Sequence, residues 1–207
     1  MNKKRIAVFA SGRGSNAEAL YEAMQRGEIA GEIVVVVSDH ADAKVLEKAK
    51  GWNVPAIAAE RSDFDSKEAF EGYILEQLAP YRPDYIALAG YMRLLSGQFI
   101  SQYERRIINI HPALLPSFKG LHAQRQAIEA GVKVAGCTVH FVDAGMDSGP
   151  IIAQTAVPVY DEDTEESLSA RILVQEHATY CRVMKLLCED RITCRGQIVA
   201  GAHGKEE

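Results

Sequence analysis

Short apolar, β-branched runs alternate with segments of helical periodicity along this chain, and that alternation constrains the fold more than any other feature. Runs of this kind are RIAVF (5–9), EIVVVVS (32–38), VPAIA (54–58) and DYIALAG (84–90). Helical patterns follow the first three of them, at about 16–26, 42–50 and 66–78. Strands that alternate with helices of this length form right-handed βαβ units around a parallel sheet. The nearly continuous apolar character of VVVV suits a strand that is covered on both faces.

The pattern becomes less regular after Arg105. It predicts a strand RIINIH (106–111), a short helix at about 123–130, strands AGCTVHFV (135–142) and GPIIAQTAVPV (149–159), a helix from Asp163 or Thr164 to about Cys188, and a hairpin RITCRGQIV (191–199). The DAGMDS segment is too short to hold a crossover helix, so we expect the strands that it joins to be antiparallel. The sequence therefore predicts an α/β fold in one domain over residues 1–207. Its sheet should be Rossmann-like, mixed but mostly parallel and twisted, with helices on both faces.

Composition excludes several classes of protein. The chain has 207 residues, of which 47% are hydrophobic, and a formal net charge of −5. Such a chain can bury a substantial core, and its acidic balance argues against broad binding of nucleic acid or anionic membranes. Apolar runs are too short for a membrane span or a secretory signal, which favours a cytoplasmic protein. The cysteines and histidines lack metal-ligand spacing, so we expect free thiols and no metal.

The segment SGRGSNA (11–17) follows the first expected strand and opens a helix. Its glycines allow tight backbone conformations, and the helix N-terminus with Ser15 and Asn16 offers donors to an anion. The segment loosely satisfies a dinucleotide-binding fingerprint, and Asp39 ends the second strand where such folds keep a ribose-binding acid. A capped turn, a phosphate site and a dinucleotide site all remain open from this segment.

Asn109 and His111 end the strand 106–111 and should project to the same side, because side chains two residues apart share a strand face. Pro112 cannot continue the hydrogen-bond ladder, so the strand stops there. A carboxamide and an imidazole side by side can stabilise an oxyanion and move a proton. The alternative is a satisfied pair of polar groups at a strand end.

Two acidic features could complete such a site. The loop DAGMDSGP (143–150) carries Asp143 and Asp147, which are either solvated turn residues or a carboxylate that orients His111, favours its cationic form and serves as a base. Glu176 lies in the middle of an apolar helical stripe that includes Leu168 and Tyr180. A carboxylate on a buried face needs a structural partner or a ligand.

Taken together, these motifs resemble the glycinamide ribonucleotide formyltransferases, which use 10-formyltetrahydrofolate in purine synthesis. The resemblance covers residues 5 to about 190 and rests on ASGRGSN, LAGYMRLL (88–95), INIHPALLPSFKGLHA (108–123), GCTVHFVDAGMDSGPI (136–151) and VQEHATY (174–180). It implies a nucleotide-binding half at about 1–100 and a catalytic and folate half at about 101–200.

The resemblance also implies a reaction and its residues. A formyl group passes from 10-formyltetrahydrofolate to the glycyl amine of glycinamide ribonucleotide, without a metal. The implied residues are catalytic Asn109, His111 and Asp147, phosphate-binding Gly14, Ser15 and Asn16, folate-binding Lys67, Met92, Arg93, Leu94, Leu95 and Asn109, and Glu176 at the glycinamide end of the substrate. An edge strand or residues 84–104 could support a homodimer, as occurs in this family.

Two positions depart from the family pattern. Ala113 stands where relatives commonly carry serine, and Lys67 where they often carry arginine. Lysine keeps the charge and loses the planar fork of the guanidinium, which affects affinity for the folate tail rather than the chemistry.

The alternatives differ in what surrounds the same motifs. A 10-formyltetrahydrofolate deformylase passes the formyl group to water, and its relatives add an N-terminal regulatory domain. Methionyl-tRNA formyltransferases add a C-terminal RNA-binding domain, and an acidic chain suits tRNA poorly. From another class, a non-catalytic dinucleotide-binding module could use Gly12, Gly14 and Asp39.

Overall fold

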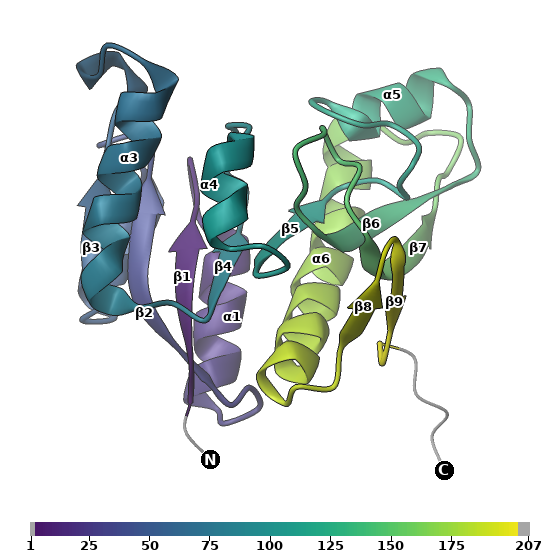
Figure 1. The fold of residues 1–207 in the computed structure, drawn as a ribbon. Helices are drawn as coiled ribbons and strands as arrows, with labels where there is room; N and C mark the ends of the chain where they lie inside the picture. Colours follow the sequence, from purple (N-terminus) through teal and green to yellow (C-terminus); the bar gives the residue numbers. More distant parts are fainter. Residues whose placement is uncertain (1–2, 203–207) are drawn as a thin grey trace. The chain divides into compact units, whose positions relative to one another are not determined.

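The structure is a computed structural model that describes residues 3–202. These residues form two compact units, of which the first ends at Ile108 and the second begins at Asn109. Figure 1 shows the helices and strands of both. The unit boundary lies beyond the division at about residue 100 that the family resemblance implies. The last part of the expected domain, residues 203–207, lies outside the described residues.

The first unit is built on parallel strands, as the apolar runs predict. They are β1 (Lys4–Phe9), β2 (Gly31–Ser38), β3 (Ala56–Ala58) and β4 (Tyr85–Leu88), in the order β3-β2-β1-β4. In β1, Ile6 pairs with Ile33 on one side and with Tyr85 on the other, and both pairings are parallel. Both β1 and β2 carry consecutive side chains with no exposed surface, which is why their sequences show no polar alternation.

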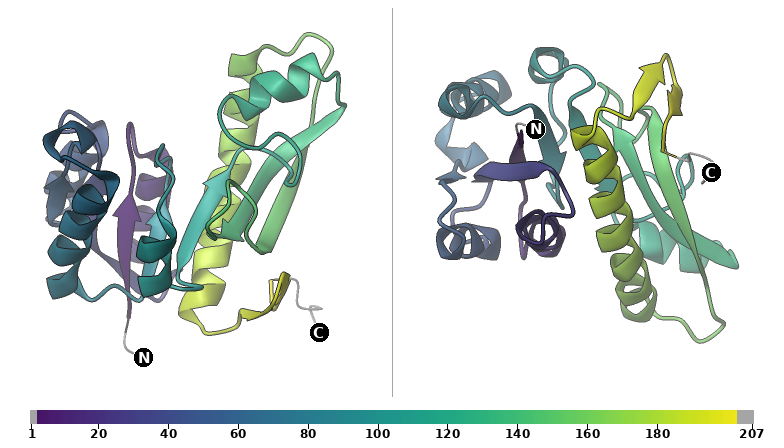
Figure 2. Two further views of the ribbon diagram at one scale, coloured as in Figure 1. Left: turned by 45° about the horizontal axis from the view of Figure 1, so that its top comes forward. Right: turned by 90° about the horizontal axis from the view of Figure 1, so that it is seen from below.

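Helices of the first unit cover both faces of this sheet, as the views in Figure 2 show. They are α1 (Ser15–Gln25), α2 (Lys44–Gly51), α3 (Lys67–Leu78) and α4 (Gly97–Gln102), with short 3-10 turns at Arg61–Asp63 and Ala79–Tyr81. The helices α1 and α2 pack on β2 and on each other, while α3 packs against α4. The sequence pattern did not predict α4, because six residues are too few to show a helical period. Ser96 starts it by accepting a hydrogen bond from the backbone N–H of Phe99.

The second unit contains a sheet and one long helix. Its strands are β5 (Ile107–His111, counted with the two residues that precede the unit), β6 (Val134–Phe141) and β7 (Ile151–Pro158), in the order β5-β6-β7. The β6–β7 pair is antiparallel, which confirms the prediction made from their short connection. The helix α6 (Glu165–Cys188) packs on β6 and β7, and α5 (Ala123–Glu129) packs on α6. The predicted hairpin consists of β8 (Thr193–Arg195) and β9 (Ile198–Ala200).

The start of α6 shows how local sequence fixes an element. Thr164 accepts a hydrogen bond from the backbone N–H of Ser167, and the Ser167 hydroxyl accepts one from the backbone N–H of Thr164. This capping box confirms Thr164 as the N-cap. The fold class predicted from the sequence, α/β with a mixed and mostly parallel sheet, is confirmed.

Candidate active site

The strand β5 places Asn109 and His111 on one strand face at its carboxyl end, as their spacing predicts. His111 is 5% exposed, and Asn109 is half-buried. The chain that follows is held by β6, because the Thr138 hydroxyl donates to the carbonyl of Ala113 over 2.6 Å and accepts from the backbone N–H of Leu115 over 3.0 Å. Residue 113 therefore holds the chain after β5 through its backbone carbonyl, and a serine hydroxyl at this position is not needed for that hydrogen bond.

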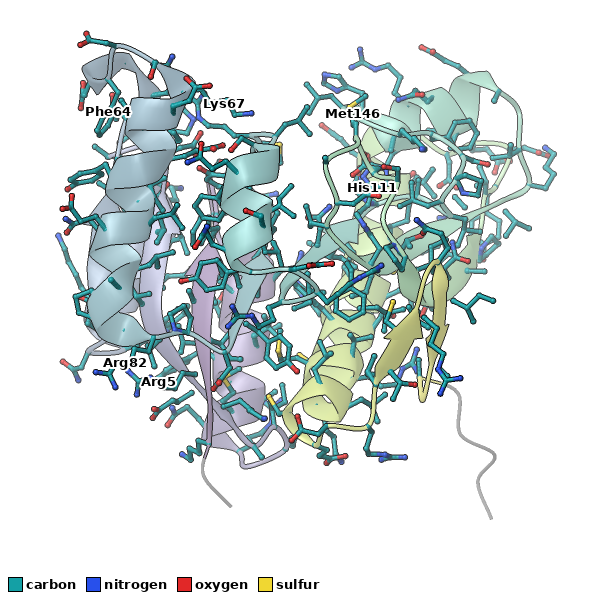
Figure 3. All side chains as sticks on the ribbon, viewed as in Figure 1. Arg5, Phe64, Lys67, Arg82, His111 and Met146 are labelled. Carbon is teal, nitrogen blue, oxygen red and sulfur yellow. The ribbon has the colours of Figure 1, made fainter. Side chains whose placement is uncertain are left out.

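The imidazole of His111 is held from both nitrogens. Its Nε2 lies 2.8 Å from the carbonyl oxygen of Phe118, which can only accept, so Nε2 carries a proton. Its Nδ1 lies 3.5 Å from Oδ2 of Asp147. At this separation the carboxylate would attract a second proton on Nδ1, which would make the ring an imidazolium. Figure 3 shows His111 and Met146, the neighbour of Asp147, at the same end of the second unit.

The two aspartates of the loop 143–150 have different hydrogen-bond partners. Asp147 accepts the backbone N–H of Gly120 over 2.8 Å and has a left-handed backbone, with φ of 48°. Asp143 instead accepts from the backbone N–H of Gly145 and from the Ser148 hydroxyl, over 3.1 and 2.7 Å. Asp143 thus stabilises the loop, and Asp147 is the carboxylate that the structure brings to His111.

His140 on β6 belongs to this cluster, and the sequence reasoning did not single it out. Its Nε2 lies 3.2 Å from Nδ2 of Asn109 and 3.8 Å from Oδ1 of Asp147, and its Nδ1 lies 2.9 Å from the carbonyl oxygen of Phe141. Burial lowers the pKa of this imidazole. A sequence signal existed, because Thr138 and His140 are polar residues at alternate positions of an otherwise apolar strand.

The glycine loop of the first unit forms a helix N-terminus, as expected of an anion site. Gly14 has φ of 69° and precedes α1, whose first residues are Ser15 and Asn16. A Cβ at Gly14 would lie 2.5 Å from a methyl carbon of Val45, so this position requires glycine for space and for backbone conformation. Asn16 is 7% exposed. Backbone N–H groups at such a helix start favour a phosphate.

Asp39, the candidate ribose-binding acid of a dinucleotide site, has a protein partner. Its Oδ2 accepts a hydrogen bond of 2.7 Å from Nε of Arg93, and its side chain is 1% exposed. A carboxylate that is buried and paired with a guanidinium is a poor receptor for a ribose hydroxyl. This pairing counts against the dinucleotide-binding alternative.

The residues that the resemblance assigns to folate, except Asn109, line one pocket of the first unit. This pocket has a volume of about 340 Å³, and its lining includes Lys67, Met92, Arg93, Leu94 and Leu95. Met92 and Leu94 are large apolar side chains that are 63% and 61% exposed, whereas Leu95 is buried. Lys67 lies 3.8 Å from the carboxylate of Glu71. Exposed apolar side chains beside the cationic side chains of Arg61, Lys67 and Arg93 fit a ligand with an aromatic body and an acidic tail.

Glu176 lies on the buried face of α6 and is 8% exposed, as the apolar stripe predicts. It is close enough to β6 to affect Cys137: burial raises the pKa of that thiol to about 11, and the charge of Glu176 adds to the shift. Cys137 and the other cysteines are free thiols.

Within residues 3–202, the structure holds no cluster of three or more His, Cys, Asp or Glu side chains arranged to bind a metal ion. None of the helices in that range combines the length and hydrophobicity that a membrane span requires.

This chain is similar to several known proteins. The family model described as formyl transferase matches residues 4–184. The phosphoribosylglycinamide formyltransferase of Bacillus subtilis (strain 168) is 47% identical over 184 residues, which cover 89% of this chain and 94% of that protein. The crystal structure of glycinamide ribonucleotide transformylase 1 from Symbiobacterium toebii has a TM-score of 0.93 and 48% identity, and the match covers 96% of this chain and 93% of that one. A formyltetrahydrofolate deformylase from Pseudomonas syringae pv. tomato has a TM-score of 0.89 at 28% identity, and the match covers 96% of this chain and 66% of that chain.

Proposed function

Because the chain belongs to the formyl transferase family, we propose that it transfers a formyl group from 10-formyltetrahydrofolate to the glycyl amine of 5-phosphoribosylglycinamide. The products are N-formyl-phosphoribosylglycinamide and tetrahydrofolate, in purine biosynthesis. Both substrates are small molecules, and the reaction uses no metal, nucleic acid or membrane. We further propose a single formyltransferase domain, a cytoplasmic location and a homodimer.

The observation that carries this proposal is the contact between His111 and Asp147 next to Asn109. The amine attacks the formyl carbon, and negative charge develops on the formyl oxygen. Asn109 and protonated His111 stabilise that oxygen, a contribution of about 2.7–4 kcal/mol for each well-placed donor. Asp147 stabilises the imidazolium and accepts the proton that the amine loses, directly or through a water molecule. When the oxyanion collapses, the bond between the formyl carbon and N10 of the folate breaks, and this proton passes to N10, which leaves as tetrahydrofolate.

One contact has to change before this chemistry can occur. The carbonyl oxygen of Phe118 accepts the Nε2 proton of His111 and stands where a formyl oxygen would accept it. Phe118 has a positive φ of 53° and lies in the segment between β5 and α5. In our proposal this segment moves when substrates bind, and the substrate oxygen replaces the backbone carbonyl.

The first unit supplies most of the binding groups in this proposal, and α6 of the second unit supplies Glu176. Gly14, Ser15 and Asn16 hold the phosphate of the ribonucleotide through the N-terminus of α1. Met92, Arg93, Leu94 and Leu95 line the folate site, and Lys67 lies near the acidic tail of the folate. Glu176 on α6 contacts the glycinamide end of the ribonucleotide.

A turnover assay and a thermal-stability assay separate the proposed function from its alternatives. The protein is mixed with 10-formyltetrahydrofolate with and without phosphoribosylglycinamide, folate absorbance is followed, and the formylated ribonucleotide is identified by mass spectrometry. We expect turnover that requires the ribonucleotide. Folate release that ignores the ribonucleotide would identify a deformylase instead. Thermal stabilisation by NAD, without stabilisation by the ribonucleotide, would support the dinucleotide-binding module.

A further inference from the structure

His140 is a buried histidine of the second unit that the mechanism above does not use. It is 2% exposed, and both ring nitrogens have polar neighbours. Nδ1 lies 2.9 Å from the carbonyl oxygen of Phe141, and Nε2 lies 3.2 Å from the amide nitrogen of Asn109. These contacts fix the protonation state of the ring and the orientation of the amide together.

The chemistry of the partners decides the tautomer. A backbone carbonyl can only accept, so Nδ1 of His140 carries the proton. In the neutral ring Nε2 then has a lone pair and no proton, and the atom that it meets must be a donor. That atom is Nδ2 of Asn109, which has two N–H groups and gives one of them to His140. The second N–H remains for the substrate.

We propose that His140 is a positioning residue: its unprotonated Nε2 accepts one N–H of Asn109 and so directs the other N–H of that amide to the formyl oxygen. Without this acceptor, the Asn109 side chain could rotate and present its carbonyl oxygen to the developing negative charge. An acceptor in that place would repel the oxyanion that Asn109 has to stabilise.

The neutral state of His140 also protects the pair formed by His111 and Asp147. Nε2 of His140 lies 3.8 Å from Oδ1 of Asp147, so a proton on Nε2 would draw the carboxylate away from His111. The surroundings keep that proton off. Burial is the main cause of the lowered pKa of His140, and the charge of His111 lowers this pKa further. The hydrogen bond to the Phe141 carbonyl and the charges of Asp147 and Asp143 act in the opposite direction and raise it.

This proposal rests on the proposed function, and a pair of variants tests it. An asparagine in place of His140 can reproduce the Nδ1 donor to Phe141 but has no atom at the position of Nε2. A glutamine there can place an oxygen at the position of Nε2, where it can accept the N–H of Asn109. We expect His140→Asn to lower kcat by about 10- to 100-fold, because the oxyanion donor is misplaced, with KM for both substrates within about threefold. His140→Gln should be less impaired. Equal impairment of the two variants, or a His140→Asn enzyme with the parent kcat, would overturn the proposal.

A double-mutant cycle separates positioning from general damage. If His140 acts through Asn109, then adding His140→Asn to an Asn109→Ala enzyme should lower kcat by no more than about twofold. A structural defect would instead lower kcat by the same factor in the parent enzyme and in the Asn109→Ala enzyme, and that result would refute the positioning role.

Ring ¹⁵N NMR of the parent protein gives a test that needs neither a folded variant nor activity. We expect His140 to be the neutral tautomer, with its proton on Nδ1, at pH values above the ordinary histidine pKa of about 6.5, because burial lowers its pKa further. A proton on Nε2 in this range would overturn the proposal even in an active enzyme. Conversely, a parent protein that shows the expected tautomer and no formyl transfer would refute the proposed function alone.

Discussion

Replacing Asp147 by asparagine removes one negative charge and keeps the shape of the side chain. The asparagine oxygen can still accept the N–H of Gly120, so the contact between the two loops should survive. In the proposed mechanism, what is lost is the attraction between this carboxylate and protonated His111, whose Nδ1 lies 3.5 Å from Oδ2 of Asp147. The variant therefore tests the charge of Asp147 separately from its contribution to the loop.

The size of the effect follows from this distance and from burial. Two unit charges at this separation attract by about 4 to 5 kcal/mol at an effective dielectric constant of about 20. The Asp147 side chain is 13% exposed, so water screens part of this attraction. A remaining 2 to 3 kcal/mol corresponds to roughly a 30- to 150-fold loss of turnover. Loss of the proton acceptor adds to it, because general bases contribute about 10²- to 10⁴-fold. We expect kcat to fall by at least about a hundredfold.

Steady-state kinetics with both substrates and calorimetry with the ribonucleotide alone provide the measurements. The affinity for the ribonucleotide should stay within about threefold of the parent, because the phosphate loop is unchanged. Asp143→Asn is the matched control, since Asp143 lies in the same loop and accepts hydrogen bonds from Gly145 and Ser148. It should reduce turnover far less. Near-normal turnover of the Asp147 variant, or equal losses in both variants, would show that the charge beside His111 is not what drives the reaction.

Three further predictions concern stability and reactivity. Gly14→Ala should lower the free energy of unfolding by about 2–4 kcal/mol and weaken ribonucleotide binding, because Gly14 has a left-handed backbone and the new Cβ would clash with Val45. Gly12→Ala is the control, since its Cβ would meet no described atom within 4 Å, and equal urea midpoints for the two variants would contradict the argument. Hydrogen bonds from Arg171 are the main cause that lowers the pKa of Asp163, so their stabilisation is present above the unfolded pKa of about 3.9 and is lost as the pH falls below it. Asp163→Asn should thus reduce the urea midpoint at neutral pH and flatten its decline in acid, and an unchanged acid profile would count against this pair. Cys137, which is fully buried and whose pKa is raised to about 11, should stay unmodified when the folded protein is treated with iodoacetamide near pH 8, and mass spectrometry would reveal any contrary labelling.

The regular part of the fold could be predicted because its signals are local. Buried parallel strands produce uninterrupted apolar runs, and the long helix α6 carries its own capping box. The helix α4 escaped prediction because its six residues are shorter than two helical turns. Its start depends on the Ser96 cap, which resembles any turn serine in sequence.

The candidate site was predictable only where neighbours along the chain share a direction. Asn109 and His111 follow from the period of a strand. His140 did not, because its relation to Asn109 depends on the order of the strands, which bring together residues that are 31 positions apart. The role of Asp39 was misleading for the same reason, since its partner Arg93 lies 54 positions away. The distinction between Asp143 and Asp147 depends on the backbone path of one short loop.

The left-handed backbone of Asp147 has a consequence for how this protein can vary. Few residues other than glycine adopt such a conformation cheaply, and aspartate and asparagine are the usual exceptions. Glutamate could supply the same charge, but it would strain the loop as well as lengthen the side chain. In a library randomised at this position, folded members should therefore be mostly aspartate, asparagine and glycine, and aspartate alone combines a tolerated backbone with an acid. The proposed reaction requires an acid at position 147, and the left-handed backbone favours aspartate over glutamate there. Both constraints act against the evolution of a different acid at this position.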